Sequence, residues 1–118
     1  MGPAAPHPSE VAPPAELRYV TAYVKPFKLD EVVDALAALP VDALTVEEVR
    51  GYGRQKGHLE LYRGTEYEIT FLPKVRVELA TPLAHLEEVL RAIEETAKTG
   101  RIGDGKVFVR AARRVEEA

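Results

Sequence analysis

The spacing of apolar residues changes from two to three or four near residue 26, which strongly limits the folds open to this chain. Residues 17–25 alternate between apolar and polar, which predicts a β-strand that Pro26 ends. Residues 28–39 follow helical spacing until Pro40, a residue that stops helices. The chain therefore begins with a strand and an amphipathic helix, whose apolar stripe is Leu29, Val32, Val33, Leu36 and Leu39.

Two further strands are expected after this helix. Residues 44–49 indicate a second strand, which we expect Gly51 and Gly53 to close. The apolar residues at odd positions between 67 and 79 predict one long third strand. Pro73 interrupts that pattern, so we expect it at a sheet edge or a bulge.

A second helix and a last strand complete the pattern. Thr81 and Pro82 are predicted to be the N-cap and the first residue of the helix. The helical stripe occupies residues 83–97, and Gly100 stands where a left-handed residue often ends a helix. Residues 107–109 mark a short fourth strand.

The resulting order is βαββαβ, which is that of the ferredoxin-like fold. We therefore expect an α+β sandwich in which two helices cover one face of an antiparallel four-stranded sheet. The other face also needs a cover, and self-association is the simplest way to supply it. Residues 16–118 would form one domain, preceded by a flexible leader at residues 1–15 that holds five of the nine prolines.

The connection between the second and third strands, residues 50–67, is long and polar. Connections in compact domains usually have about 4–6 residues, and longer ones are commonly functional or disordered. This connection opens with glycines, carries several cations and ends beside Tyr67. We expect it to contact a ligand or another protein.

Composition argues against several functions. The chain has no cysteine, which excludes disulfides, thiolate catalysis and cysteine metal sites, and its one serine, Ser9, lies in the leader. A formal net charge of −3 argues against nucleic-acid binding. No apolar run approaches the roughly 20 residues that span a bilayer, so a cytoplasmic protein is expected.

A glycine-rich segment from Thr99 to Lys106 joins the second helix to the last strand. Glycines let backbone N–H groups approach an anion, and Arg101 and Lys106 supply positive charge. The spacing is not that of a Walker A motif. From these residues alone, a phosphate-binding loop and a helix end followed by a tight turn are equally well supported.

Two other segments carry candidate binding residues. Between residues 51 and 57, Arg54 and Lys56 suit phosphate and Gln55 offers a neutral oxygen to Mg²⁺, with a solvated loop tip as the alternative. Lys74 alternates with the apolar residues of its strand, so it suits a small dicarboxylate or is an ordinary strand lysine. The three histidines are scattered and form no metal motif.

Taken in order, these motifs resemble those of the PII nitrogen-regulatory signalling family. The resemblance covers residues 18–110, nearly the whole expected domain. Several long motifs in the right order are more specific than a single glycine-rich loop. The matching segments are 24–32, 51–58, 62–67, 71–74 and 99–108.

The resemblance implies a homotrimer that binds ATP or ADP in the clefts between subunits. The residues that would line the phosphates are Gly51, Arg54, Arg101, Gly103, Asp104, Gly105 and Lys106. Thr45 and Glu78 would contact the adenosine from the neighbouring subunit. The residues implied for 2-oxoglutarate, which joins Mg-ATP, are Gln55, Lys56, Gly57 and Lys74, with Gln55 also holding Mg²⁺.

The resemblance further implies a non-enzymatic sensor of nitrogen and energy status. The long connection corresponds to the family's T-loop, at about residues 52–67, which docks on targets. Family targets include ammonium transporters of the Amt family and enzymes of nitrogen assimilation, so a membrane would be reached only through a partner. Tyr67 matches a tyrosine that is uridylylated, and Thr65 stands where some members carry a phosphorylated serine.

The chain departs from the family after its last strand. Family members usually continue with a segment whose two arginines reach the nucleotide phosphates, whereas here Arg113 and Arg114 precede the last residues, 115–118. One alternative is a divergent trimer whose response to nucleotide or 2-oxoglutarate is altered or lost. Two others are a scaffold with a decayed ligand site and a small phosphotransferase or acylphosphatase-like enzyme on the same fold.

Overall fold

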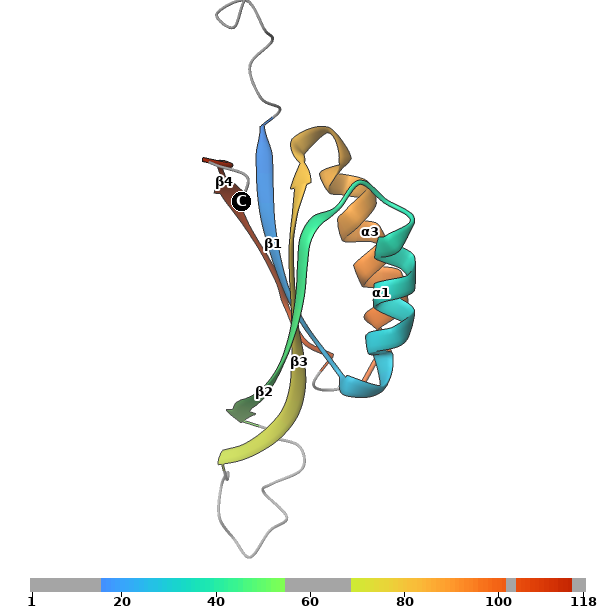
Figure 1. Cartoon of the computed structure of the whole chain (residues 1–118). Helices are drawn as coiled ribbons and strands as arrows, with labels where there is room; N and C mark the ends of the chain where they lie inside the picture. Colours follow the sequence, from blue (N-terminus) through green and yellow to red (C-terminus); the bar gives the residue numbers. More distant parts are fainter. Residues whose placement is uncertain (1–15, 55–68, 102–103, 116–118) are drawn as a thin grey trace, which may run out of the picture.

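The computed structural model describes residues 16–54, 69–101 and 104–115. In these residues the elements follow the predicted βαββαβ order, with a short 3₁₀ turn before each helix (Figure 1). The strands are β1 (Leu17–Val24), β2 (Asp42–Arg54), β3 (Ile69–Pro82) and β4 (Val107–Ala112). The helices are α1 (Leu29–Ala37) and α3 (Leu86–Ala97), and the 3₁₀ turns are η1 (Pro26–Lys28) and η2 (Leu83–His85).

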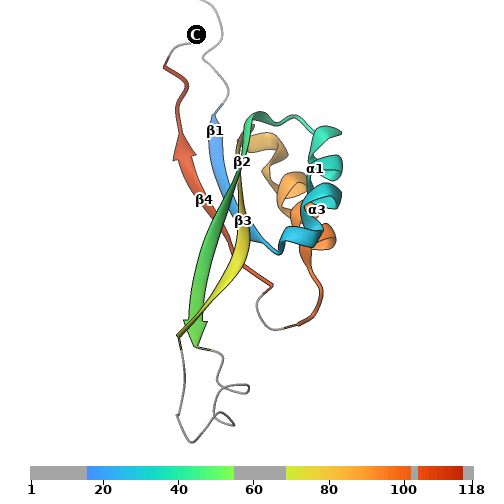
Figure 2. The ribbon, with the colours of Figure 1, turned by 60° about the horizontal axis from the view of Figure 1, so that its bottom comes forward.

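The four strands form one antiparallel sheet in the order β2-β3-β1-β4. Both helices lie against the same face of this sheet, so the molecule has two layers (Figures 1 and 2). The expected ferredoxin-like arrangement is therefore confirmed. Neither described helix combines the length and the hydrophobicity that crossing a bilayer requires.

The hydrophobic core fills the space between the sheet and the two helices. Alternate residues of a strand point to the same face, so the period-two pattern puts one row of side chains under the helices. The buried row comes from the two central strands and meets the apolar stripes of both helices. The strand residues of this core are Val20, Ala22, Val24, Val75, Val77 and Leu79, and the helix residues are Val32, Leu36, Val89, Ile93 and Ala97.

Strand β2 continues through both glycines that we expected to close it. Gly51 and Gly53 remain in register with β3, and the pairing ends at Arg54 opposite Ile69. The neighbouring strand supplies hydrogen-bond partners along this whole length, which outweighs the weak strand preference of glycine. The strand pairing thus extends into the predicted connection, of which residues 55–68 lie outside the described part of the chain.

The outer part of β3 pairs with β2 alone. The pairing with β1 ends where Val24 faces Val75, whereas β3 begins at Ile69. The two strands thus project as a ribbon beyond the rest of the sheet (Figure 1). Pro73, opposite Arg50, lies in this ribbon, where β3 is an edge strand on its β1 side, as predicted.

The predicted N-cap at Thr81 is wrong, because Thr81 and Pro82 belong to β3. Thr81 is fully buried, and its hydroxyl donates a 2.8 Å hydrogen bond to the carbonyl of Pro40. Pro82 faces Leu17, so β1 still pairs with β3 at this point. Tertiary pairing and burial thus outweigh the local preference for a helix cap, and the helical segment starts at η2.

The first helix ends before its predicted last residue, whereas the second ends at the last residue of its predicted stripe. The first ends at Ala37 rather than Leu39, because the residue before Pro40 disfavours helical geometry. The second ends at Ala97, and Lys98 is extended. Gly100 nevertheless has the predicted positive φ, 78°, within the loop that follows.

We expect Thr81→Val to destabilise the fold, since valine keeps the buried volume but leaves the Pro40 carbonyl without its hydrogen bond. The expected loss is about 1–3 kcal/mol in the free energy of unfolding. Urea denaturation at a fixed protein concentration measures it. Thr96→Val is the matched control, because the Thr96 hydroxyl bonds to Ala92 in its own helix, a bond that adds little stability. If both variants lost the same free energy of unfolding, the Thr81–Pro40 hydrogen bond would not be the cause of the loss.

Candidate functional site

The candidate binding residues that the structure describes gather mainly at one end of the sheet. The N–H of Tyr23 donates a 2.9 Å hydrogen bond to the carbonyl of Lys106, just before β4 begins. On the other side of β1, Val24 faces Val75, the residue that follows Lys74. Lys74 and Lys106 are far apart in sequence, yet they flank the end of the same strand.

The carboxylate of Asp104 closes the loop that follows α3. Its Oδ2 accepts hydrogen bonds from the N–H groups of Thr99 at 3.0 Å and Gly100 at 2.8 Å, and its Oδ1 accepts one from the Thr99 hydroxyl. The Thr99 Oγ1 in turn accepts the N–H of Arg101 at 3.2 Å. We assigned Asp104 to the nucleotide phosphates by resemblance, but here its carboxylate binds the backbone of its own loop.

Lys25 links this loop to the end of β1. Its ammonium lies 3.2 Å from Asp104 Oδ1 and 3.2 Å from Thr99 Oγ1, and its side chain is only 17% exposed. Lys25 was not among the site residues expected from the sequence. The available signal was its position directly after a predicted strand and directly before a proline.

Gly105 lies where the loop packs most closely on β1. Its φ is 99°, a conformation that side chains rarely permit. A Cβ at this position would lie 1.8 Å from the carbonyl oxygen of Tyr23. Glycine is therefore required here, and it sets the exposed Lys106 beside the end of the strand.

Lys74 lines a cavity of about 590 Å³ at the base of the β2–β3 ribbon. Burial lowers the pKa of the Lys74 ammonium, repulsion from Lys25 lowers it further, and Asp104 raises it. Gly51 lies next to this lysine, since a Cβ there would be 3.6 Å from Lys74 Cγ. A partly buried cation in a cavity of this size suits a small carboxylate. The other lining residues are Pro26, Glu48, Val49, Arg50, Pro73 and Val75.

A second cavity, of about 410 Å³, lies between α3 and β4. Its wall is largely apolar, with Leu90 and Ile93 from the helix and Val107 and Val109 from the strand. Residues 104–106 line it as well, so the loop borders this cavity too.

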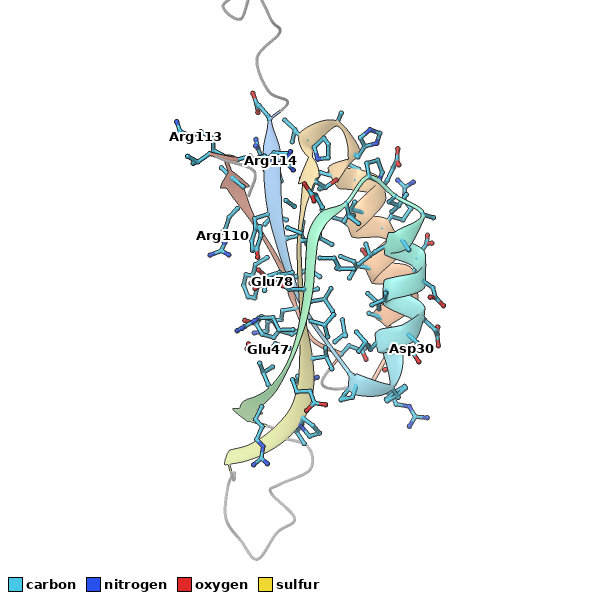
Figure 3. The ribbon with its side chains drawn as sticks, viewed as in Figure 1. Asp30, Glu47, Glu78, Arg110, Arg113 and Arg114 are labelled. Carbon is cyan, nitrogen blue, oxygen red and sulfur yellow. The ribbon has the colours of Figure 1, made fainter. Side chains whose placement is uncertain are left out.

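Thr45 and Glu78 lie away from this cluster. They face each other across β2 and β3, and Glu78 projects from the sheet face opposite the helices (Figure 3). The Glu78 carboxylate accepts a 3.0 Å hydrogen bond from the Thr21 hydroxyl and pairs with Arg76 at 3.8 Å. Glu78 lies four positions along β3 from Lys74, which is about 13 Å at roughly 3.3 Å per residue. One chain therefore does not bring all the expected nucleotide contacts together.

The other expected site residues are less fully described. Arg101 is exposed in the loop, and only the backbone of Arg54 is placed, in β2. Residues expected to bind Mg²⁺ and 2-oxoglutarate or to be modified, together with one loop glycine, lie outside the described ranges: Gln55, Lys56, Gly57, Thr65, Tyr67 and Gly103. Within those ranges, no group of three His, Cys, Asp or Glu side chains could hold a metal ion.

Arg113 and Arg114 lie at the end of the sheet opposite the ribbon (Figure 3). Arg114 forms an ion pair with Asp42, at the start of β2. Both arginines thus lie away from the described residues of the loop after α3.

A protein-family model described as nitrogen regulatory protein P-II matches residues 17–118. The nitrogen regulatory protein P-II of Rhizobium etli is 56% identical over 93 residues, covering 79% of this chain and 83% of that protein. The P-II protein of Rhodospirillum rubrum is 53% identical over 102 residues, with coverages of 86% and 88%. Nitrogen regulatory protein GlnK of Escherichia coli is 50% identical over 99 residues, with coverages of 84% and 88%.

Solved structures of GlnK from Bacillus subtilis are similar in fold. One has a TM-score of 0.68 and 30% identity, covering 83% of this chain and 86% of that chain. A second is described as a GlnK–ATP complex, with a TM-score of 0.68, 30% identity and coverages of 82% and 84%. These likenesses agree with the fold built above from the strand pairings.

The contacts of Asp104 predict how acid affects stability. The hydrogen bond from the Thr99 hydroxyl holds the pKa of this carboxyl well below its usual range, opposed by burial and helped by the Thr99 N–H, Lys25 and the Gly100 N–H. A carboxyl with a lowered folded-state pKa stabilises the fold above its unfolded pKa of about 3.9, and this contribution is lost as the pH falls towards the folded-state value.

We therefore expect the thermal midpoint of the wild type to fall more steeply below about pH 4 than that of Asp104→Asn. Calorimetric scans between about pH 7 and pH 3 measure both slopes. Asp34→Asn, at an exposed position on α1, is the control and should keep the wild-type slope. Parallel wild-type and Asp104→Asn curves would show that the loop contacts do not depend on the charge.

Proposed function

This chain belongs to the nitrogen regulatory protein P-II family, and from that membership we propose that it senses nitrogen and energy status by binding ATP or ADP together with 2-oxoglutarate. Its relatives are named as nitrogen regulatory proteins, and a similar solved structure is described as a complex with ATP. We take residues 16–118 as the signalling domain, residues 1–15 as a separate leader and the protein as a regulator without enzymatic activity.

The observation that carries this proposal is the cluster at the end of β1. Lys25 pairs there with Asp104 and acts on Lys74, and the backbone of Lys106 bonds to Tyr23 at the same strand end. Glycine-rich backbone beside cations suits phosphate groups. We assign the triphosphate to this loop, with the phosphate-lining residues that the resemblance implied.

We propose that the Lys74 cavity receives a carboxylate of 2-oxoglutarate. A bound anion favours the charged form of a lysine whose pKa burial has lowered, which supports such an assignment. Gln55, Lys56 and Gly57 would complete this subsite, and Gln55 would also contact Mg²⁺. Because the two ligands would lie next to each other, each is expected to strengthen the binding of the other by the same factor.

The adenosine contacts assigned to Thr45 and Glu78 require a second subunit, and we propose a homotrimer. The sheet face away from the helices has no cover within the described part of one chain. It carries Phe108, which is 52% exposed and meets Tyr23 at a ring-centroid distance of 6.3 Å. Arg110, labelled in Figure 3, lies over the ring of Tyr19 on the same face. Burying this mixed aromatic and charged face supports self-association.

We further propose that the T-loop carries the signal to a partner. The ribbon of β2 and β3 projects away from the core, and the residues proposed as the T-loop join its two strands in sequence (Figure 2). An ammonium transporter of the Amt family or an enzyme of nitrogen assimilation is the expected target, so the protein would be cytoplasmic and would reach a membrane only through its partner. Tyr67 and Thr65 are the proposed sites of uridylylation and phosphorylation.

Ligand binding is tested by calorimetric titration with ATP and Mg²⁺, with and without 2-oxoglutarate. We expect the wild type to bind ATP more tightly when 2-oxoglutarate is present. Lys106→Met should weaken ATP binding about tenfold or more, because it removes a charge-assisted contact to phosphate. Lys74→Met should retain ATP binding but lose the effect of 2-oxoglutarate. The control Lys28→Met removes a lysine that pairs with Glu31 and should behave as the wild type.

The other outcomes of this titration separate the alternatives. ATP binding that ignores 2-oxoglutarate in the wild type would identify a divergent nucleotide sensor. Binding of neither ligand would favour a scaffold. Steady hydrolysis of ATP, abolished by one side-chain change, would contradict a purely regulatory role.

Assembly is tested by light scattering on the eluted protein. We expect a mass three times the 13.0 kDa of one chain. Phe108→Glu should lower that mass, because it puts a charge on the face proposed to be buried. Phe27→Glu is the control, since Phe27 is 70% exposed on η1, outside that face. A wild-type mass of one chain would contradict the trimer.

A further inference from the structure

Arg110, on β4, carries a charge that the ligand assignments above do not use. Its guanidinium carbon lies 5.2 Å from the centre of the Tyr19 ring, and the residue is exposed. None of the ion pairs within residues 16–54, 69–101 and 104–115 includes Arg110. The face of a ring attracts a cation but does not neutralise its charge, so Arg110 can still pair with an anionic group.

An acidic cluster lies on β2 and β3 and consists of Glu47, Arg76 and Glu78. Arg76 forms ion pairs with both glutamates, so two carboxylates share one guanidinium and the cluster keeps one net negative charge. The Glu47 side chain is 62% exposed, whereas that of Glu78 is 23% exposed and accepts the Thr21 hydroxyl. Glu47 is therefore the carboxylate that a second molecule reaches most easily.

The two opposite charges lie at opposite edges of the sheet. The strand order β2-β3-β1-β4 puts Glu47 on one edge strand and Arg110 on the other, about 14 Å apart at roughly 4.8 Å between neighbouring strands. Figure 3 shows Glu47, Glu78 and Arg110 on the sheet face away from the helices. This is the face that carries the exposed Phe108 and that we propose to be buried on assembly.

A closed ring of identical chains brings such edges together. In a ring, each contact joins two different patches, so one side of a chain meets the other side of the next chain. The edge that carries Arg110 then faces the edge that carries the acidic cluster. One positive and one net negative patch per chain are thus complementary between copies of the same chain.

We propose that Arg110 of one chain pairs with the acidic cluster of the neighbouring chain, with Glu47 as its main contact, and that this pair fixes how the copies align. The inference rests on the proposed homotrimer and names the residues that set its register. Each chain supplies one arginine and one acidic cluster, so three pairs close a ring of three chains. Complementary charges across an interface fix its register and reject wrong partners, while apolar groups such as Phe108 supply buried area.

The test is a charge swap followed by light scattering over a dilution series, which gives the chain concentration at half-assembly. We expect Arg110→Glu to raise this concentration about tenfold or more, because it sets a carboxylate against the acidic cluster. Glu47→Arg should raise it as well, and the double variant should return it close to the wild-type value. The control Arg91→Glu makes the same charge change at an exposed position on α3 and should have no effect.

A neutral variant separates the charge of Arg110 from its packing. Arg110→Met keeps an apolar stem beside Tyr19 and removes the charge, at an exposed position where the fold should tolerate it. Salt screens an ion pair, so raising NaCl from about 0.1 M to about 1 M should weaken assembly of the wild type relative to that of Arg110→Met. Equal salt responses would show that the charge takes no part in assembly, and this would overturn the inference.

The results distinguish failure of the inference from failure of the proposed trimer. A trimeric wild type whose Arg110→Glu variant keeps the same half-assembly concentration would overturn the inference alone. A double variant that assembles less well than either single variant would place Arg110 and Glu47 in separate contacts, which also overturns the pairing. A wild type that stays a single chain would overturn both the trimer and the pair. Weakened assembly in both single variants, with recovery in the double variant, is the supporting result.

Discussion

The pairing of β1 with both of its neighbours is the interaction on which the fold and the site depend. It buries Val20, Ala22 and Val24 under the helices, and its register ends with Val24 opposite Val75 on one side. On the other side the Tyr23 N–H bonds to the carbonyl of Lys106. Because both neighbours are anchored to the same strand end, segments that are far apart in the sequence bring cations close to it. The sheet thus fixes the positions of the segments that hold these cations.

The layer arrangement was predictable because it depends on patterns that are local in sequence. The period-two rows of β1 and β3 and the helical stripes each indicate their own element, and βαββαβ order then permits few topologies. Element ends were less predictable, since they depend on partners that lie elsewhere. Thr81 was expected to cap a helix, but burial against Pro40 keeps it in β3. Gly51 was expected to end β2, but a paired strand carries the ladder past it.

The candidate site was predictable as a set of segments rather than as a set of contacts. Motif resemblance selects Asp104, but it does not say that the carboxylate binds the Thr99 and Gly100 amides of its own loop. Lys25 was missed because its meaning lies in Asp104, a residue far along the chain. Glu78 was selected by the resemblance, but its hydrogen bond from Thr21 becomes visible only when β1 and β3 are aligned. Side-chain partners across strands leave no periodic signal in the sequence.

A single chain supplies only part of the proposed nucleotide site, which has a thermodynamic consequence. The loop cations lie at the end of β1, whereas Thr45 and Glu78 lie further along β2 and β3 on the open face of the sheet. If the second set serves a neighbouring subunit, nucleotide bridges two chains and binds the assembly more tightly than the separated chain. Mass action then requires nucleotide to stabilise the assembly, and assembly to raise the affinity for nucleotide. The open face and the ligand site are, on this reasoning, two parts of one equilibrium.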